Sequence, residues 1–170
     1  MDKFTERDIQ LLISDKFCFN KKHELIVPNI TTLHDFWEAD LVSMTKSFFL
    51  HEFEIKTTRS DWLKEYRIIA EGRNDGCKFR RAVALHKQFN SDTDLGSSPN
   101  YFWVCAPSGV VKDDELPSYA GMIEVYRFRK VDRLKIIKPA PRLHSGKCSD
   151  KMIASMYRSL NFKFWNMRKK

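Results

Sequence analysis

The run at residues 49–56 constrains the fold of this chain more than any other segment. It reads Phe-Leu-His-Glu-Phe-Glu-Ile-Lys, and alternation along a strand would place Glu52, Glu54 and Lys56 on one face and apolar side chains on the other. Carboxylates buried between apolar neighbours are costly unless they meet a cation, and a divalent metal ion is one such cation. The segment therefore predicts a strand whose charged face is a candidate functional site.

Hydrophobic spacing and turn residues predict alternating helices and strands along the chain. We expect helices at 6–19, 59–71, 78–87 and after Ser149, a loop at 90–100, and strands at 23–30, 38–45, 47–57, 101–106, 121–127 and 134–138. This order indicates an α/β (α+β) protein with a mixed central sheet of four to five strands flanked by helices, whose first three strands are antiparallel neighbours.

The last 32 residues form a basic C-terminal linker and helix, 139–170, after a main domain at 1–138. Pro139 and Pro141 mark the linker, and we expect the helix to pack on the same domain. Its apolar residues recur at helical spacing, a pattern typical of core packing. That stripe consists of Ile153, Met156, Leu160, Phe164 and Met167, with Tyr157 and Trp165 beside it.

Charge is unevenly distributed between the two parts of the chain. Residues 126–170 hold 14 Lys and Arg against two acids, Asp132 and Asp150, which gives +12, whereas the first 125 residues hold 16 basic and 20 acidic residues, which gives −4. Such asymmetry favours a polyanionic partner, most often nucleic acid, over the alternative of a merely solvated surface.

The sequence carries no signal for a membrane or a secretory route. It contains no run of about 18 apolar residues, and its N-terminus has no apolar leader segment. Cys18, Cys77, Cys105 and Cys148 lie far apart and form no Cys-x-x-Cys pair. We therefore expect reduced thiols, no membrane partner and a cytoplasmic protein.

Asp40 adds a second carboxylate to the charged strand. If the strands at 38–45 and 47–57 pair, Asp40 can face Glu54. Two carboxylates can hold Mg²⁺ at a phosphodiester, and Lys56 can stabilise the charge that develops during hydrolysis. The competing interpretation is an exposed strand with a chance Glu-x-Lys triplet, and spacing alone does not separate the two.

Several motifs together resemble the PD-(D/E)XK nuclease superfamily and are most similar to its MmcB-like DNA-repair branch. They comprise Asp40, Glu54-Ile55-Lys56, Thr-Arg-Ser-Asp-Trp at 58–62, the aromatic strand ending in proline at 100–107, Leu-Pro at 116–117 and Ala-Gly-Met-Ile-Glu-Val at 120–125. The resemblance spans about 35–127. Two departures stand out: Ala39 replaces the proline before Asp40, and residues 72–98 are expanded so that only His86-Lys87 matches a lysine-rich stretch.

The resemblance implies a restriction-endonuclease-like core and a set of site residues. Asp40, Glu54 and the backbone of Ile55 would hold Mg²⁺, for which Mn²⁺ can substitute, and Lys56 would be the catalytic lysine. Some superfamily members use a glutamate of the first helix as a further ligand, which makes Glu6 a candidate. We favour the alternative that Glu6 is an N-terminal acid stabilised by the helix dipole.

These features predict a Mg²⁺-dependent DNA endonuclease acting in repair, recombination or restriction, on duplex or branched DNA. The alternatives are a non-catalytic nucleic-acid-binding module, which would use Tyr101, Trp103, Tyr157 and Trp165, and a subunit that needs a partner, either a second copy or a repair or replication protein. The basic residues expected to contact nucleic acid are Arg59, Arg80, Arg81, Lys87, Arg158, Lys163 and Arg168.

Overall fold

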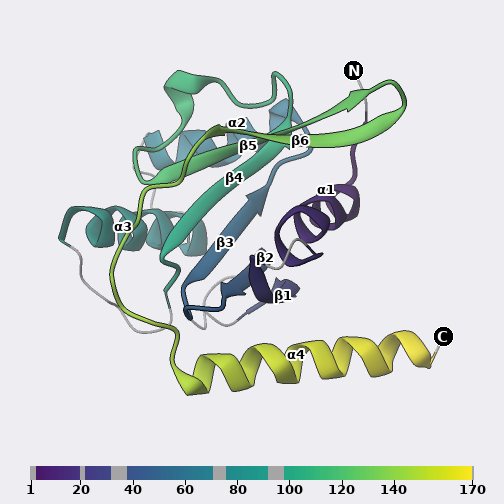
Figure 1. The fold of residues 1–170 in the computed structure, drawn as a ribbon. Helices are drawn as coiled ribbons and strands as arrows, with labels where there is room; N and C mark the ends of the chain where they lie inside the picture. The colour runs from purple at the N-terminus through teal and green to yellow at the C-terminus, as the bar shows by residue number, and fades with distance from the viewer. Residues whose placement is uncertain (1–2, 20–21, 32–37, 71–75, 92–97, 170) are drawn as a thin grey trace.

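The computed structural model describes residues 3–19, 22–31, 38–70, 76–91 and 98–169. The loop predicted at 90–100 lies largely outside these residues, as does the first part of the expanded 72–98 segment. The described chain forms one mixed sheet in the order β1-β2-β3-β4-β5-β6 (Figure 1). The strands are β1 (His23–Ile30), β2 (Ala39–Thr45), β3 (Leu50–Ile55), β4 (Tyr101–Pro107), β5 (Ala120–Phe128) and β6 (Val131–Lys138).

The sheet confirms the predicted α/β class and corrects the number of strands. β1, β2 and β3 are antiparallel neighbours as expected, β3 to β5 run parallel, and β6 returns antiparallel to β5. Six strands form instead of four to five, because the whole of β6 pairs with β5, from Val131 opposite Phe128 to Lys138 opposite Met122.

The helices are α1 (Glu6–Ser14), α2 (Arg59–Ala70), α3 (Gly76–Ser91) and α4 (Asp150–Arg168), with a π-helical turn at Asp15–Phe19 and a 3₁₀ turn at Asp113–Glu115. A capping box begins α1: the Asp8 amide donates to the Thr5 hydroxyl and the Thr5 amide to the Asp8 carboxylate. α3 is longer than the helix predicted at 78–87. None of the described helices is long and apolar enough to cross a membrane.

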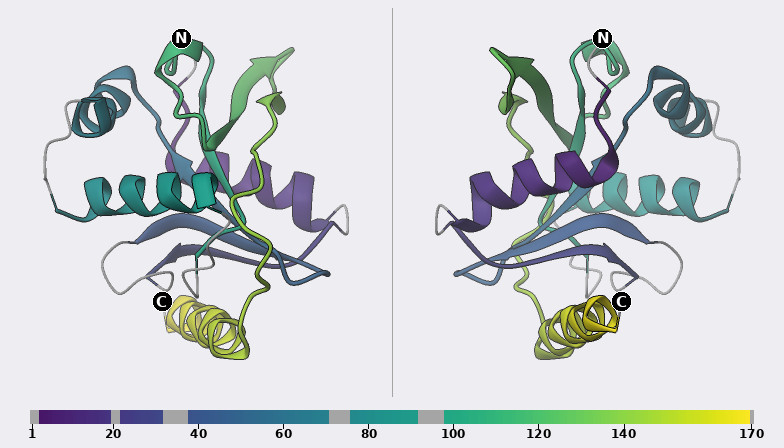
Figure 2. Two further views of the ribbon diagram at one scale, coloured as in Figure 1. Left: turned by 90° about the vertical axis from the view of Figure 1, so that its left-hand side faces the viewer. Right: turned by 90° about the vertical axis from the view of Figure 1, so that its right-hand side faces the viewer.

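The helices cover both faces of the sheet (Figures 1 and 2). α1 packs on one face, where Ile9 and Ile13 join a cluster with Phe53 and Ile55 of β3. α2 and α3 pack on the other face, where Trp62 and the α3 side chains meet β4 and β5. β3 lies near the middle of the sheet, and all six of its residues are buried. Phe53 and Ile55 pack toward α1, whereas Glu52 and Glu54 pair with Arg81 of α3, which confirms the predicted alternation.

The segment between β6 and α4 is held against the sheet by two close contacts. A Cβ on Gly121 would lie 2.5 Å from the Ala140 backbone nitrogen, so only glycine allows this approach. The Asn100 side chain accepts from the Leu50 amide and donates to the carbonyls of His144 and Gly146. These contacts fix where α4 begins.

α4 docks on the sheet through its first half only. Ser149 caps it by accepting from the Met152 amide at 3.3 Å, and Met152 and Met156 are buried in a cluster with β1, β2 and the start of β3. Further along the predicted stripe, Phe164 is 48% exposed and Met167 69% exposed. The prediction that the whole stripe packs in the core is therefore wrong for its second half, which extends past the docking surface.

We therefore expect two methionine truncations on α4 to lower the free energy of unfolding by different amounts. Met156→Ala should lower the free energy of unfolding by about 2–5 kcal/mol, because it opens a cavity in the α4 contact. Met167→Ala should change it by less than about 0.5 kcal/mol, because that side chain is already in solvent. Urea titration followed by circular dichroism measures both, and equal losses would contradict the division of the helix.

Candidate functional site

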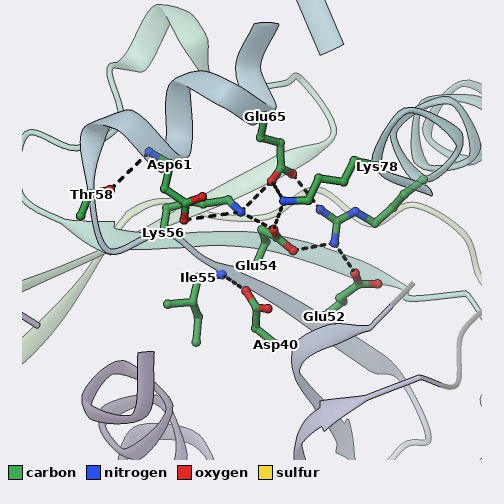
Figure 3. Close-up of polar contacts among 10 residues, drawn as sticks. Asp40, Glu52, Glu54, Ile55, Lys56, Thr58, Asp61, Glu65 and Lys78 are labelled. Atoms are coloured by element: carbon green, nitrogen blue, oxygen red, sulfur yellow. Dashed lines mark hydrogen bonds and ion pairs between the residues drawn. The ribbon is translucent and has the colours of Figure 1, made fainter. Parts of the chain in front are cut away.

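The charged face of β3 forms a buried ion-pair cluster with α2 and α3 (Figure 3). Glu54 accepts from the Lys56 ammonium at 2.6 Å and from the Arg81 guanidinium at 2.5 Å. Glu65 of α2 pairs with the same two cations, each at 2.7 Å, and Arg81 also reaches Glu52 at 3.3 Å. The cluster therefore joins three glutamates through two buried cations.

The charges of this cluster keep each other ionised despite their burial. Burial raises the pKa of Glu54, but Arg81 and Lys56 outweigh it, so the pKa of Glu54 lies well below its usual value. Burial lowers the pKa of Lys56, but Glu54 and Glu65 outweigh it and raise that pKa above its usual value. The cation expected from the sequence is thus supplied by the chain itself.

The position of Arg81 corrects one prediction. The sequence predicts that Arg81 contacts nucleic acid, but its side chain is 3% exposed and paired with Glu52, Glu54 and Glu65. Helical spacing explains the difference, because Ala82 and Leu85 turn this side of α3 toward the sheet and carry Arg81 with them.

Asp40 lies beside Glu54, where the pairing of β2 with β3 ends. Leu41 lies opposite Phe53, so the antiparallel register continued by one residue brings Asp40 next to Glu54. The Asp40 carboxylate accepts from the Ile55 amide at 2.6 Å. Burial first, and then the charge of Glu54, raise the pKa of Asp40 to about 7. The structure therefore brings Asp40, Glu54 and Lys56 together at one end of β3.

Glu6 approaches Asp40 from α1, on the other side of the site. Its carboxylate accepts from Gln10 at 2.9 Å and from Asn29 at 2.8 Å. The same Gln10 amide nitrogen lies 2.8 Å from the Asp40 carbonyl, to which it also donates. Glu6 is one of the charges that raise the pKa of Asp40. Its place beside the carboxylate pair keeps both sequence interpretations of Glu6 open.

Four residues of this arrangement were absent from the sequence prediction: Gln10, Asn29, Glu65 and Lys78, which pairs with Glu65 at 3.0 Å. A signal existed for Glu65, because it lies three residues after the buried Trp62 and so shares the inward side of α2. Asn29 adopts a left-handed backbone conformation with φ of 47°, which asparagine tolerates better than most residues. Its role depends on contacts with α1 that no local pattern encodes.

The other basic residues predicted to bind nucleic acid lie apart from the cluster. Arg59 pairs with Glu115 and donates to the Val110 carbonyl, and its hydrogen bond to Glu115 lowers the pKa of that carboxyl to about 2. Arg80 and Lys87 lie exposed on α3, and Arg158 and Arg168 lie exposed on α4. Lys163 of α4 is half-buried and donates to the Asn29 carbonyl at 3.1 Å.

The oxygen donors at this end of β3 suit a hard cation. Within the described ranges, no three His, Cys, Asp or Glu side chains gather as a metal cluster. The available donors are the Asp40 and Glu54 carboxylates and main-chain carbonyls, which is the chemistry that Mg²⁺ prefers. A carboxylate has about four lone-pair positions, so Glu54 can accept from Lys56 and Arg81 and still offer an oxygen to an ion.

Comparison with known proteins supports the fold and leaves the chemistry open. No family model matches the chain, and no curated protein does. A solved structure described as the SPO1766 protein of unknown function from Silicibacter pomeroyi matches with a TM-score of 0.60 and 10% identity. The match covers 99% of this chain and 94% of that one, so the two share a fold over nearly their full lengths.

The ion-pair cluster predicts that Arg81→Gln is strongly destabilising. Removing the guanidinium takes away a buried cation that contacts Glu52, Glu54 and Glu65 together, which should cost about 3–5 kcal/mol at pH 7. Below about pH 4.5 the difference from the parent should shrink. Glu54 of the parent has a pKa below its usual value, so the stability that its ionised form contributes is lost as the pH falls below that usual value. Guanidinium titrations at pH 7 and pH 4 measure this, with the exposed Arg80→Gln as control; an equal loss for Arg80→Gln would contradict it.

The raised pKa of Asp40 predicts that the ionised form of Asp40 lowers the stability of the fold as pH rises, in contrast to the ion pairs of Arg81. Unfolded Asp40 releases its proton near its usual pKa of 3.8 and folded Asp40 near 7, so ionisation of Asp40 destabilises the fold as pH rises between these values. Asp40→Asn removes this term and keeps an oxygen for the Ile55 amide. The free energy of unfolding of the variant, relative to that of the parent, should therefore increase by roughly 2–4 kcal/mol from pH 4 to pH 8. Thermal unfolding across that pH range measures the difference, with Asp113→Asn as the control. Parallel curves of stability against pH for the parent and Asp40→Asn would refute the prediction.

Proposed function

We propose that this protein is a Mg²⁺-dependent DNA endonuclease that acts in repair, recombination or restriction. One observation carries the proposal: Asp40 of β2 and Glu54 of β3 lie side by side where these strands stop pairing, and Lys56 contacts Glu54. Two carboxylates with an adjacent lysine are suited to metal-assisted phosphodiester hydrolysis. The motif resemblance and the basic C-terminal part of the chain point to the same chemistry.

Each residue has a definite task in this proposal. Bound Mg²⁺ would polarise a phosphoryl oxygen and lower the pKa of a coordinated water. Asp40 and Glu54 hold the ion, and the Ile55 amide fixes the orientation of Asp40. Lys56 stays protonated because of Glu54 and Glu65, so it can stabilise negative charge on the phosphate that is attacked.

Glu65 and Arg81 are positioning residues in this arrangement. They hold Lys56 and Glu54 from the side of α2 and α3, and their own burial leaves these two side chains little freedom. Fixed orientation of catalytic groups contributes to rate because no reorganisation is needed during the reaction.

A second candidate is a nucleic-acid-binding module without catalysis. It is favoured by the same Arg81 contact, because Lys56 and Arg81 already neutralise Glu54 without a metal ion. A protein of this class would bind DNA with no need for Mg²⁺, and Mg²⁺ would not change its melting temperature.

The proposal predicts that Asp40→Asn, Glu54→Gln and Lys56→Gln each lower the rate of Mg²⁺-dependent cleavage by about 10²–10³. DNA affinity should change much less, because these groups act at the phosphate that is cleaved. Supercoiled, single-stranded and branched DNA should be incubated with each variant, using Asp113→Asn as a control that keeps the parent rate. Circular dichroism verifies that each variant is folded.

Two outcomes would contradict the nuclease. The first is cleavage by Glu54→Gln at the parent rate, which would place the activity elsewhere. The second is a parent protein that binds DNA but cleaves none of the three substrates and shows no change of melting temperature with Mg²⁺. That second result would support the non-catalytic module.

A further inference from the structure

A polar groove of about 330 Å³ lies between α4 and the end of β1. Its lining is rich in groups that donate hydrogen bonds to phosphate oxygens. From β1 and the residue after it come Asn29 and Thr31, and from α4 come Ser155, Arg158, Ser159 and Lys163. The groove therefore presents two cations and three hydroxyl groups to an anionic ligand.

The groove adjoins the candidate site through a chain of hydrogen bonds. Lys163 donates to the Asn29 carbonyl at 3.1 Å, and the Asn29 side chain donates to Glu6 at 2.8 Å. Glu6 and Asp40 are linked by Gln10, which donates to both. The groove is therefore connected to the candidate site through Asn29, Glu6 and Gln10.

Exposed aromatic rings continue from the groove along the outer half of α4. Phe162 lines the groove and is 60% exposed, and Trp165 is 56% exposed. The Trp165 indole donates to Asn161 on its own helix, and Phe164 meets its ring edge-on with centroids 5.3 Å apart. Two contacts within its own helix therefore hold Trp165, and Phe162 and Trp165 both remain more than half exposed.

The charge of this half of α4 complements a polyanion. Residues 151–169 contain no Asp or Glu, and Lys163, Arg168 and Lys169 lie among the aromatic rings. A basic groove beside exposed aromatic rings is the combination that binds single strands, because phosphates pair with the cations while unpaired bases stack on the rings. The bases of a duplex are stacked on each other and would leave the rings without a partner.

We propose that the groove and the outer half of α4 bind single-stranded nucleic acid, with phosphates at Arg158 and Lys163 and bases on Phe162 and Trp165. Combined with the proposed nuclease, on which this step rests, the substrate is DNA with an unpaired segment, such as a flap or a branch. The groove holds the unpaired strand and directs it to Asp40 and Glu54.

The test measures binding of fluorescent single-stranded and duplex oligonucleotides in EDTA, so that cleavage plays no part. The parent should prefer the single strand. Phe162→Ala and Trp165→Ala should each weaken single-strand binding about fivefold or more, whereas the equally exposed Met167→Ala should leave it unchanged. All three positions are on the surface, so the variants should keep the fold.

The groove is tested by the salt dependence of binding. Each phosphate neutralised on a single strand contributes about 0.7 to the slope of log affinity against log salt. Arg158→Ser with Lys163→Ser should therefore lower the slope by about 1.4. Lys46→Ser with Lys64→Ser removes the same charge from other exposed positions and should leave the slope near that of the parent.

Three results would overturn the proposal. The first is an equal salt slope of binding for the two double variants, and the second is a single-strand affinity that Trp165→Ala leaves unchanged. The third is evidence that the exposed half of α4 binds another partner. In the last case Trp165→Ala would abolish either self-association in sedimentation or binding to phosphatidylserine vesicles, while nucleic-acid affinity stayed at the parent level.

The outcome also separates this proposal from the nuclease. Single-strand binding that depends on α4, without any cleavage, supports the groove and removes the nuclease. Cleavage that depends on Glu54, on plain duplex only and with α4 dispensable, supports the nuclease and removes the groove.

Discussion

The contact of Arg81 with three glutamates is the interaction on which the rest of the structure depends. β3 lies near the middle of the sheet and is buried throughout, so its two carboxylates, Glu52 and Glu54, cannot reach water. Glu52 and Glu54 can be buried there because α3 carries the Arg81 guanidinium into the layer and Lys56, the residue after β3, adds an ammonium group. Without that compensation, three carboxylates in a low-dielectric layer would oppose folding.

The same cluster leaves one carboxylate in a different electrostatic state. Asp40 lies at the end of the paired region of β2, and burial first, then the nearby charge of Glu54, raises its pKa to about 7. The chain therefore combines a buried ion-pair network under α2 and α3 with a carboxyl group of raised pKa at its edge. Such a contrast is typical of functional sites, where charge is arranged for a task and not for stability alone.

The two halves of α4 also differ, because the first half packs on the sheet and the second half is exposed. Its first half packs Met152 and Met156 against the sheet and fixes the helix axis. That docking holds the second half along the end of β1, where Lys163 reaches Asn29. One helix thus supplies a hydrophobic anchor and an exposed basic, aromatic surface near the carboxylate pair.

The sequence by itself determined the local elements and the two faces of β3. Alternation at 49–56 predicted which side chains share a face, and the register of an antiparallel pair brought Asp40 to Glu54, as the structure has them. Capping at Thr5 and Ser149 likewise followed from local chemistry, since each cap needs only a few neighbouring residues. Only the tertiary structure decided the partners. The sequence predicted an accessible Arg81 and a buried outer stripe of α4, and the structure has the reverse. Local patterns cannot predict this, because burial depends on which distant segment covers a face and how far that segment extends.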